Sequence, residues 1–312
     1  TMLELVTTRH NPMIDPSLHV WGWEIPVYLF LGGWVAGCMV LSGWLMRRGR
    51  APGERSVAYV LPWVGIVLLS LGMGALFLDL EHRLYVWRMY LTLQPTSPMS
   101  WGGWILILVY PVLLLGALAS VPGGLLSRWP SVEALSARLR RPASLSRLGT
   151  ANIAVGVALG IYTGILLSSL GARPLWASAV LGPLFLVSGL STGAAFAHMV
   201  SRDPAEQSTL LRADNAFLMV ELALIALFLI GLLTAGAVHS NAAALLLGGP
   251  YTAVFWVLVV GLGIVLPLLI QSLMASHRIG HTLVAPLLVM LGGLALRFVI
   301  VSAGQYGHWI SP

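Results

Sequence analysis

Two ionisable residues, Glu221 and Arg297, stand alone inside long apolar stretches of this 312-residue chain. A charge at the centre of a bilayer costs at least ~2.5 kcal/mol even on the most lenient insertion scale, so such groups are candidates for function by default. A carboxylate and a guanidinium can move protons or bind a polar ligand. What they do depends on the elements that position them.

Other polar residues gather toward one end of the apolar stretches, which we call the outer layer. Glu24 and Tyr28 lie one helical turn apart, and Asp79 and His82 follow the exit of the second stretch. At a rise of 1.5 Å per residue, Tyr162 lies roughly 12 Å below the outer end of its stretch. These residues offer several hydrogen-bond donors and acceptors next to apolar surface.

Arg297 falls in the outer third of the last stretch by the same arithmetic, whereas His198, Asp214 and Glu221 lie toward the opposite, inner side. A lipid-soluble quinone requires an apolar channel with a few polar groups for its two carbonyls, and its reduction takes up two protons. The outer layer suits such a site, although spacing alone does not identify it. Structural roles also fit. The tyrosines suit core or interface positions, and His82 suits a surface loop. Arg297 can pair with Glu24 or Asp79, and Glu221 can hydrogen-bond to a neighbouring helix.

The composition defines the class of protein. Hydrophobic residues make up 58% and charged residues 9%, against about 25% charged residues in a soluble domain. About 20 apolar residues cross the ~30 Å core of a bilayer, and eight stretches reach that length. The sequence therefore predicts an all-α polytopic membrane protein, a single domain over 1–312. Its spans are expected at 23–46, 57–78, 101–121, 149–170, 174–200, 214–238, 250–274 and 282–302.

The arginines predict the orientation. All 17 basic residues are arginines, and twelve lie in the loops after spans 1, 3, 5 and 7, against four outside the spans on the other side. The excess of basic residues marks the cytoplasmic side, so both termini are expected in the periplasm of a bacterial inner membrane. This distribution explains the charge of +6 without a nucleic-acid partner.

The sequence lacks the ligand patterns of several kinds of metal site. Cys38 is the single cysteine, so an iron–sulfur cluster has no ligand set here. The eight histidines all lie at or beyond the ends of the expected spans, which argues against a haem held between facing helices. No cluster has zinc spacing.

Several segments, taken in chain order, resemble the NrfD-like family, the membrane subunits of polysulfide reductase and its relatives. They begin with Trp-Gly-Trp-Glu-Ile-Pro-Val-Tyr in the first span and include Gly-Ile-Tyr-Thr-Gly at 160–164 in the fourth. The segments that carry the resemblance are 21–37, 77–80, 97–104, 160–164, 183–193 and 296–305.

The resemblance implies two four-helix bundles without haem and a site for menaquinone or ubiquinone near the outer face. It also implies a periplasmic four-cluster ferredoxin-like iron–sulfur subunit as partner, which exchanges electrons with a catalytic subunit, often a molybdopterin enzyme. Tyr162 corresponds to the family's quinone hydrogen-bond partner, and Asp79 and Arg297 match polar positions near that pocket. Tyr28 and Ile25 stand where the polysulfide reductase subunit has a histidine and an asparagine, so two contacts differ here.

The resulting hypothesis is a quinone-reactive subunit of a respiratory oxidoreductase, not catalytic alone. Its outer site contains Tyr162, Glu24, Tyr28, Asp79, His82 and Arg297, and its candidate inner proton path contains Glu221, His198 and Asp214. Glu24 is a candidate substitute for the contacts that differ. The alternatives are a passive membrane anchor, which leaves the buried Glu221 and Arg297 unexplained, and a secondary transporter, which predicts broken helices and midplane sites.

Overall fold

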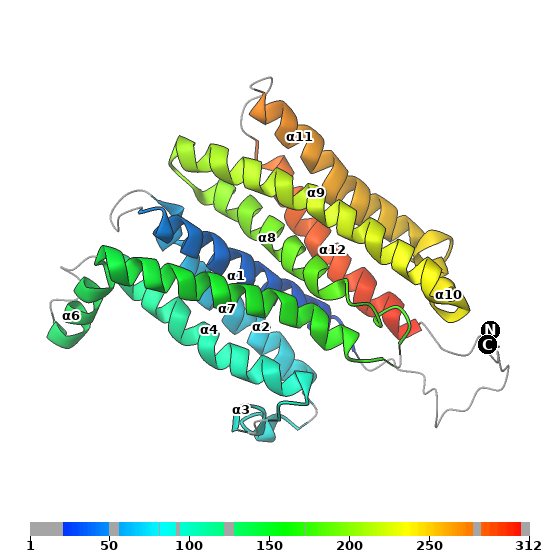
Figure 1. Cartoon of the computed structure of the whole chain (residues 1–312), viewed down its shortest axis with the longest axis horizontal. Coiled ribbons are helices and arrows are strands. Elements are labelled where there is room, and N and C mark those ends of the chain that lie inside the picture. The colour runs from blue at the N-terminus through cyan, green and yellow to red at the C-terminus, as the bar shows by residue number, and fades with distance from the viewer. Residues whose placement is uncertain are drawn as a thin grey trace.

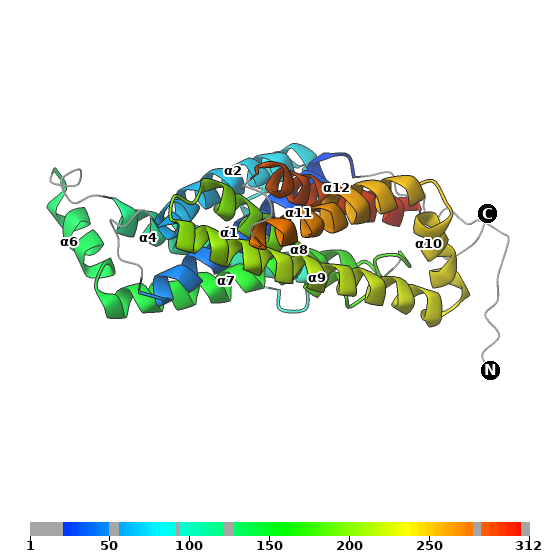
Figure 2. The same cartoon turned by 90° about the horizontal axis from the view of Figure 1, so that it is seen from above.

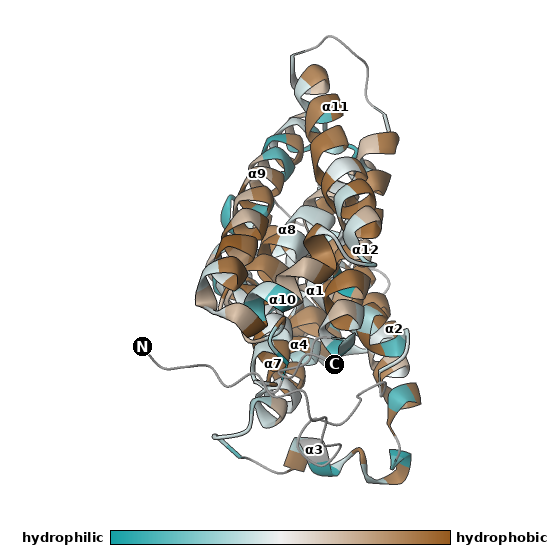
Figure 3. Cartoon of the chain, turned by 90° about the vertical axis from the view of Figure 1, so that its right-hand side faces the viewer, coloured by the Kyte–Doolittle hydropathy of each residue, from teal (hydrophilic) through white to brown (hydrophobic). Residues whose placement is uncertain are grey.

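The computed structural model describes residues 21–49, 56–80, 82–91, 94–121, 128–171, 173–276 and 282–306. All regular elements in these ranges are helical. Eight of the described helical segments are long and apolar enough to cross a membrane, which confirms the predicted class. Large apolar side chains cover their outward faces, among them Val67, Leu108, Leu227 and Leu291, each more than half exposed. Figure 3 shows that hydrophobic residues predominate along the long helices. Outward leucines of this kind need lipid around them.

The eight spans form two groups of four, in chain order (Figure 1). The first bundle contains α1 (Glu24–Arg47), α2 (Leu61–Asp79), α4 (Pro98–Ser120) and α7 (Pro142–Ser168). The second contains α8 (Leu181–Val200), α9 (Pro204–Ala235), the π-helical η3 (Val254–Val265) that continues as α11 (Leu266–Ala275), and α12 (Val284–Tyr306). Helix α1 lies centrally, because it packs on α2 and α7 of its own bundle and on α8 and α12 of the other.

Glycines bring the two bundles into backbone contact. A Cβ at Gly37 would overlap the carbonyl of Gly189, and a Cβ at Gly193 would lie 2.7 Å from the carbonyl carbon of Gly37. Small residues allow membrane helices to approach this closely. The small-residue patterns Gly32-Gly33…Gly37 and Gly189…Gly193 predict such an approach from the sequence, and the structure shows that α1 and α8 pack against each other through them.

Short elements connect the spans. On the arginine-rich side, η1 (Val57–Tyr59) precedes α2, and α6 (Pro130–Leu139) lies crosswise beyond α4 and α7 in both views (Figures 1 and 2). On the other side lie η2 (Arg83–Tyr85), α3 (Arg88–Leu91) and α10 (Ala237–Leu247). The aromatic residues within 79–100 predict a short helix lying in the membrane interface, and the structure has two short elements there, η2 and α3. Helix α10 lies almost entirely between predicted spans 6 and 7, where the sequence predicted no helix.

Three predicted span boundaries were wrong. Helix α7 begins at Pro142 rather than 149, and α9 at Pro204 rather than 214, since proline is favoured in the first turn of a helix and polar residues extend a span beyond the bilayer. The Asp203 carboxylate caps α9 by accepting from Ala205 N at 3.0 Å. Helix α8 begins at Leu181 rather than 174, because the apolar residues before it are buried within the protein in a turn.

That turn fastens the outer end of the second bundle. The Trp176 indole donates to Ile300 O at 2.8 Å and stacks on Trp21 at 5.2 Å between ring centroids. The Gln305 amide in turn accepts from Trp21 N at 3.1 Å and donates to Trp21 O at 3.0 Å. The segment before α1 is thereby joined to the end of the last helix.

Candidate functional site

Two phenols meet inside the first bundle. Tyr162 on α7 and Tyr28 on α1 are 5% and 6% exposed, and Tyr28 lies within electrostatic reach of Tyr162 and of Tyr90 on α3. The Tyr162 ring lies against Gly102 of α4 so closely that a Cβ there would overlap the phenol oxygen. Gly102 thus provides the space in which the Tyr162 hydroxyl sits.

Tyr90 approaches Tyr28 from outside the spans. Burial, and after it the Tyr110 phenol, raise the pKa of Tyr90 above its ordinary value. The Tyr90 hydroxyl therefore stays protonated at neutral pH and can donate a hydrogen bond. From the sequence Tyr90 is only an interfacial aromatic residue, because its chain position gives no signal that it reaches Tyr28.

Two carboxylates stand at the outer end of the same bundle. Glu24 begins α1 and Asp79 ends α2, both are half-buried, and the two carboxylates interact electrostatically. They are suited to pass protons between the bundle and the aqueous phase.

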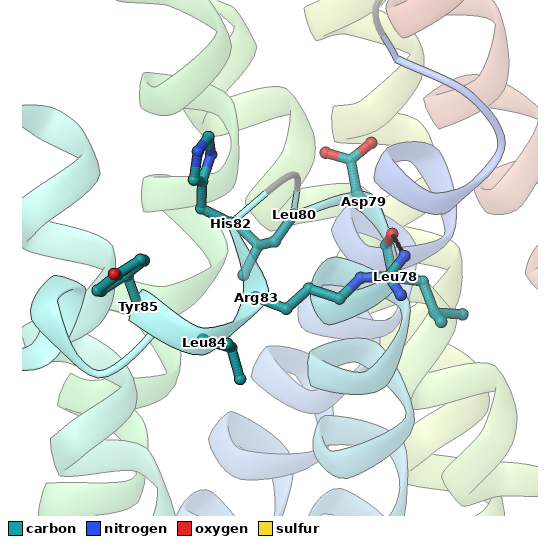
Figure 4. Close-up of a pocket in the computed structure, with 7 residues that line it drawn as sticks. All are labelled: Leu78, Asp79, Leu80, His82, Arg83, Leu84 and Tyr85. Carbon is teal, nitrogen blue, oxygen red and sulfur yellow. Dashed lines mark hydrogen bonds between the residues drawn. The ribbon is translucent and has the colours of Figure 1, made fainter.

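An open cavity of about 600 Å³ adjoins Asp79 (Figure 4). Its wall is formed by Leu78, Asp79, Leu80, His82, Arg83, Leu84 and Tyr85. The exposed His82 side chain stands in this wall, and Arg83 donates to Leu78 O at 2.8 Å, which fixes the turn. The structure thus brings His82 near Asp79 at the surface, whereas Tyr28 and Tyr162 lie inside the bundle.

Arg297 lies in a different cluster from the one expected. Its guanidinium donates to Ser188 Oγ, to Phe185 O at 2.9 Å and to Gly293 O at 3.1 Å, and it lies 4.8 Å from the centroid of the Phe185 ring. Ser188 also hydrogen-bonds to Glu221, and Glu221 interacts with Arg297. Arg297 therefore pairs through Ser188 with Glu221 rather than with Glu24.

Asp214 extends this arrangement toward the inner side. Its Oδ1 accepts from Ser191 Oγ and its Oδ2 from Gln271 Nε2, each at 2.7 Å, and its carboxylate interacts with Glu221. We call Asp214, Glu221, Arg297, Ser188, Ser191 and Gln271 the buried charge cluster. His198 is buried near the end of α8, two turns beyond Ser191.

The serines and Gln271 were missed as candidates because a hydroxyl or amide in an apolar helix does not reveal its partner. Glu206 was missed as well. It is 1% exposed, and its carboxylate accepts from Ser56 Oγ at 2.5 Å, Val57 N at 3.0 Å and Ser201 Oγ at 3.4 Å. It therefore joins the start of the second span to the start of α9 at the inner end.

These features define a class of protein. It is a multi-pass membrane protein with phenols and carboxylates in one bundle, and with a guanidinium paired to a buried carboxylate in the other. The family model described as "Polysulphide reductase, NrfD" matches residues 9–307, and the protein belongs to this family. Among the described residues, no group of three or more His, Cys, Asp or Glu side chains is arranged to hold a metal ion.

Three relatives show how far the similarity extends. The protein is 30% identical to the C chain of polysulfide reductase from Wolinella succinogenes, with 92% of its own length and 94% of the relative covered. It is 32% identical to the protein NrfD of Escherichia coli, with 92% and 95% covered. It is 26% identical to the C subunit of selenate reductase from Mesobacillus selenatarsenatis, with 91% and 74% covered. The first and the third of these relatives are each named as one polypeptide of a reductase.

Proposed function

We propose that this protein is the membrane subunit of an oxidoreductase complex and exchanges electrons and protons between membrane quinone and an iron–sulfur subunit on the outer side. The observation that carries the proposal is the meeting of the Tyr28 and Tyr162 phenols inside an apolar bundle whose outer end bears Glu24 and Asp79. The relatives named as parts of reductases support a catalytic partner, for which a molybdopterin enzyme is the candidate. The positive-inside rule supports an inner-membrane protein with periplasmic termini.

The residues fit a quinone in three respects. The two phenols can donate to its carbonyl oxygens, the bundle provides apolar walls, and the carboxylate pair can take or supply the protons. Oxidation of a quinol releases two electrons and two protons, and the reverse reaction consumes them. The electrons pass to or from the partner, since this protein has one cysteine and cannot hold a cluster. His82 and Arg83 line the same cavity as Asp79 on the outer side.

Proton movement through the second bundle is the further part of this proposal. Glu221 and Asp214, with His198 nearer the inner end, lie on the candidate route. The proton-to-electron ratio of vesicles containing Glu221→Gln tests it: a lowered ratio supports the route, and full turnover with an unchanged ratio removes Glu221 from the mechanism.

The quinone site is tested by the variants Tyr162→Phe and Asp79→Asn in the purified complex. Quinone-linked turnover is expected to fall at least tenfold, a loss on the order of one hydrogen bond or proton-transfer step. Activity with an artificial dye, which bypasses this subunit, is expected to stay unchanged. The matched control is Tyr251→Phe, which removes a phenol oxygen from the outer end of the second bundle. Wild-type quinone turnover in both variants would favour the passive anchor.

A further inference from the structure

The buried charge cluster of the second bundle lies on the proton route proposed above, and the inference that follows rests on that part of the proposed function. Asp214, Glu221 and Arg297 are 1%, 4% and 0% exposed, and they come from α9 and α12, whereas the two phenols come from α1 and α7. Burial of ionisable groups at membrane depth is energetically unfavourable, so such groups are candidates for function. The number of positive and negative groups in the cluster indicates what this function is.

One guanidinium faces two carboxylates. With all three ionised, the cluster carries a net charge of −1 inside helices surrounded by apolar side chains. An unbalanced charge in such a medium is strongly unfavourable, and an ionisable group there becomes neutral instead. The cluster reaches neutrality when it binds a single proton.

The contacts identify the carboxylate that binds it. Arg297 donates to Ser188, and Ser188 hydrogen-bonds to Glu221, so the positive charge is matched by Glu221. Asp214 receives its two hydrogen bonds from the neutral groups of Ser191 and Gln271. We propose that Asp214 holds one exchangeable proton, taken from the inner aqueous side, and that the cluster is a one-proton store set by its charge balance.

Gln271 can serve both states of such a store. Its Nε2 donates to Asp214 Oδ2, and its buried Oε1 has no hydrogen-bond partner. When Asp214 binds a proton, it needs an acceptor in place of a donor. Rotation of the terminal amide exchanges the positions of Oε1 and Nε2. Gln271 can therefore accept a hydrogen bond from protonated Asp214 or donate one to ionised Asp214 without movement of its backbone.

The surrounding helices bring few other titratable groups. The charged groups that act on Asp214 and Glu221 are each other and Arg297. Among the elements packed against α9, α8 carries His198 and α10 carries His239, which lie toward opposite ends of the bundle, and the sequences of η3 and α11 contain no titratable residue. On α1, which packs against α8 and α12, Cys38 is buried. The charge balance is therefore set within the cluster.

Infrared spectroscopy of the purified complex in vesicles, compared in H₂O and D₂O at neutral pH, tests the store. A protonated carboxyl group has a carbonyl band that shifts on deuteration. The wild type is expected to show one buried carboxyl band of this kind, and Asp214→Asn is expected to lose it. Asp203→Asn is the matched control, because it makes the same change at the start of the same helix, where asparagine also caps, and it should keep the band.

Glu221→Gln gives the decisive result. It removes one negative charge, so Arg297 and an ionised Asp214 together make the cluster neutral without a bound proton. The carbonyl band of protonated Asp214 is therefore expected to disappear, although the Asp214 side chain itself is unchanged. A band that persists in Glu221→Gln overturns charge balance as the cause, and a wild type without the band, or an Asp214→Asn variant that retains it, overturns the site. Gln271→Leu removes the hydrogen bond of the amide to Asp214, so the frequency of the carbonyl band is expected to shift. An unchanged frequency would refute the role of the amide. None of these outcomes requires quinone turnover, so they stand apart from the test of the quinone site.

Discussion

Replacing Gly102 by alanine tests the quinone site without altering a polar group. The introduced Cβ would lie 2.6 Å from Tyr162 Cε1 and closer still to the phenol oxygen. Carbon atoms in ordinary contact are about 3.5 Å apart, so the ring has to retreat by about 1 Å. A displacement of this size at a reacting group costs on the order of 10²-fold in rate. We therefore expect quinone-linked turnover to fall between tenfold and a hundredfold.

The variant is expected to fold. Crowding costs about 1–3 kcal/mol, and alanine recovers about 0.8–1.0 kcal/mol relative to glycine inside a helix. Gly74→Ala is the matched control, because a Cβ there meets nothing within 4 Å and it lies near the outer end of α2. Quinone-linked and dye-linked activities of the purified complex would be compared for both variants.

A double variant sharpens the comparison. If Gly102→Ala acts by displacing the Tyr162 hydroxyl, adding Tyr162→Phe should cost little more, since the two changes remove the same interaction. Wild-type quinone turnover in Gly102→Ala, or fully multiplicative losses in the double variant, would refute the reasoning that places the quinone beside Tyr162.

Two contacts at opposite ends of the molecule give further predictions. Glu206→Gln is expected to lower the free energy of unfolding in detergent by about 1.5–3 kcal/mol, because the hydrogen bond from Ser56 loses its ionic acceptor. Glu133→Gln on α6 is the control, and an equal loss in both variants would contradict a specific role for Glu206. Gln305→Leu is expected to raise amide exchange at Trp21 about fivefold, the equivalent of one hydrogen bond of ~1 kcal/mol. Unchanged exchange would show that the stacking of Trp21 alone holds the segment.

The spans and their class were predictable because hydropathy reports transfer into an apolar medium. The same measure does not distinguish lipid from protein interior, which explains the error at the start of α8. Leu175 and Trp176 are fully or almost fully buried, but they lie in a turn. Their apolar character is typical of a helix within the membrane, whereas they fill the outer end of the second bundle.

The depth of Arg297 was predictable and its partner was not. Depth follows from counting residues along a helix, whereas the direction of a side chain depends on how α12 is rotated against α1 and α8. Gly33 leaves room beside the guanidinium, with Nη2 lying 3.1 Å from the Cβ that a larger residue would carry. The glycine pattern predicted close packing, but it did not identify which charged group occupies the space.

The central position of α1 has a consequence for synthesis and membrane insertion. Among the described spans α1 is synthesised before α12, yet the two are in contact: Arg297 lies beside Gly33, and Gln305 holds Trp21 across 284 residues of sequence. Glu221 likewise enters the membrane before the guanidinium that balances it. Until α12 is inserted, the nascent protein has an unmatched carboxylate and an open groove along its oldest helix. The contacts that α1 makes with α12 therefore form only once this last described span has been inserted.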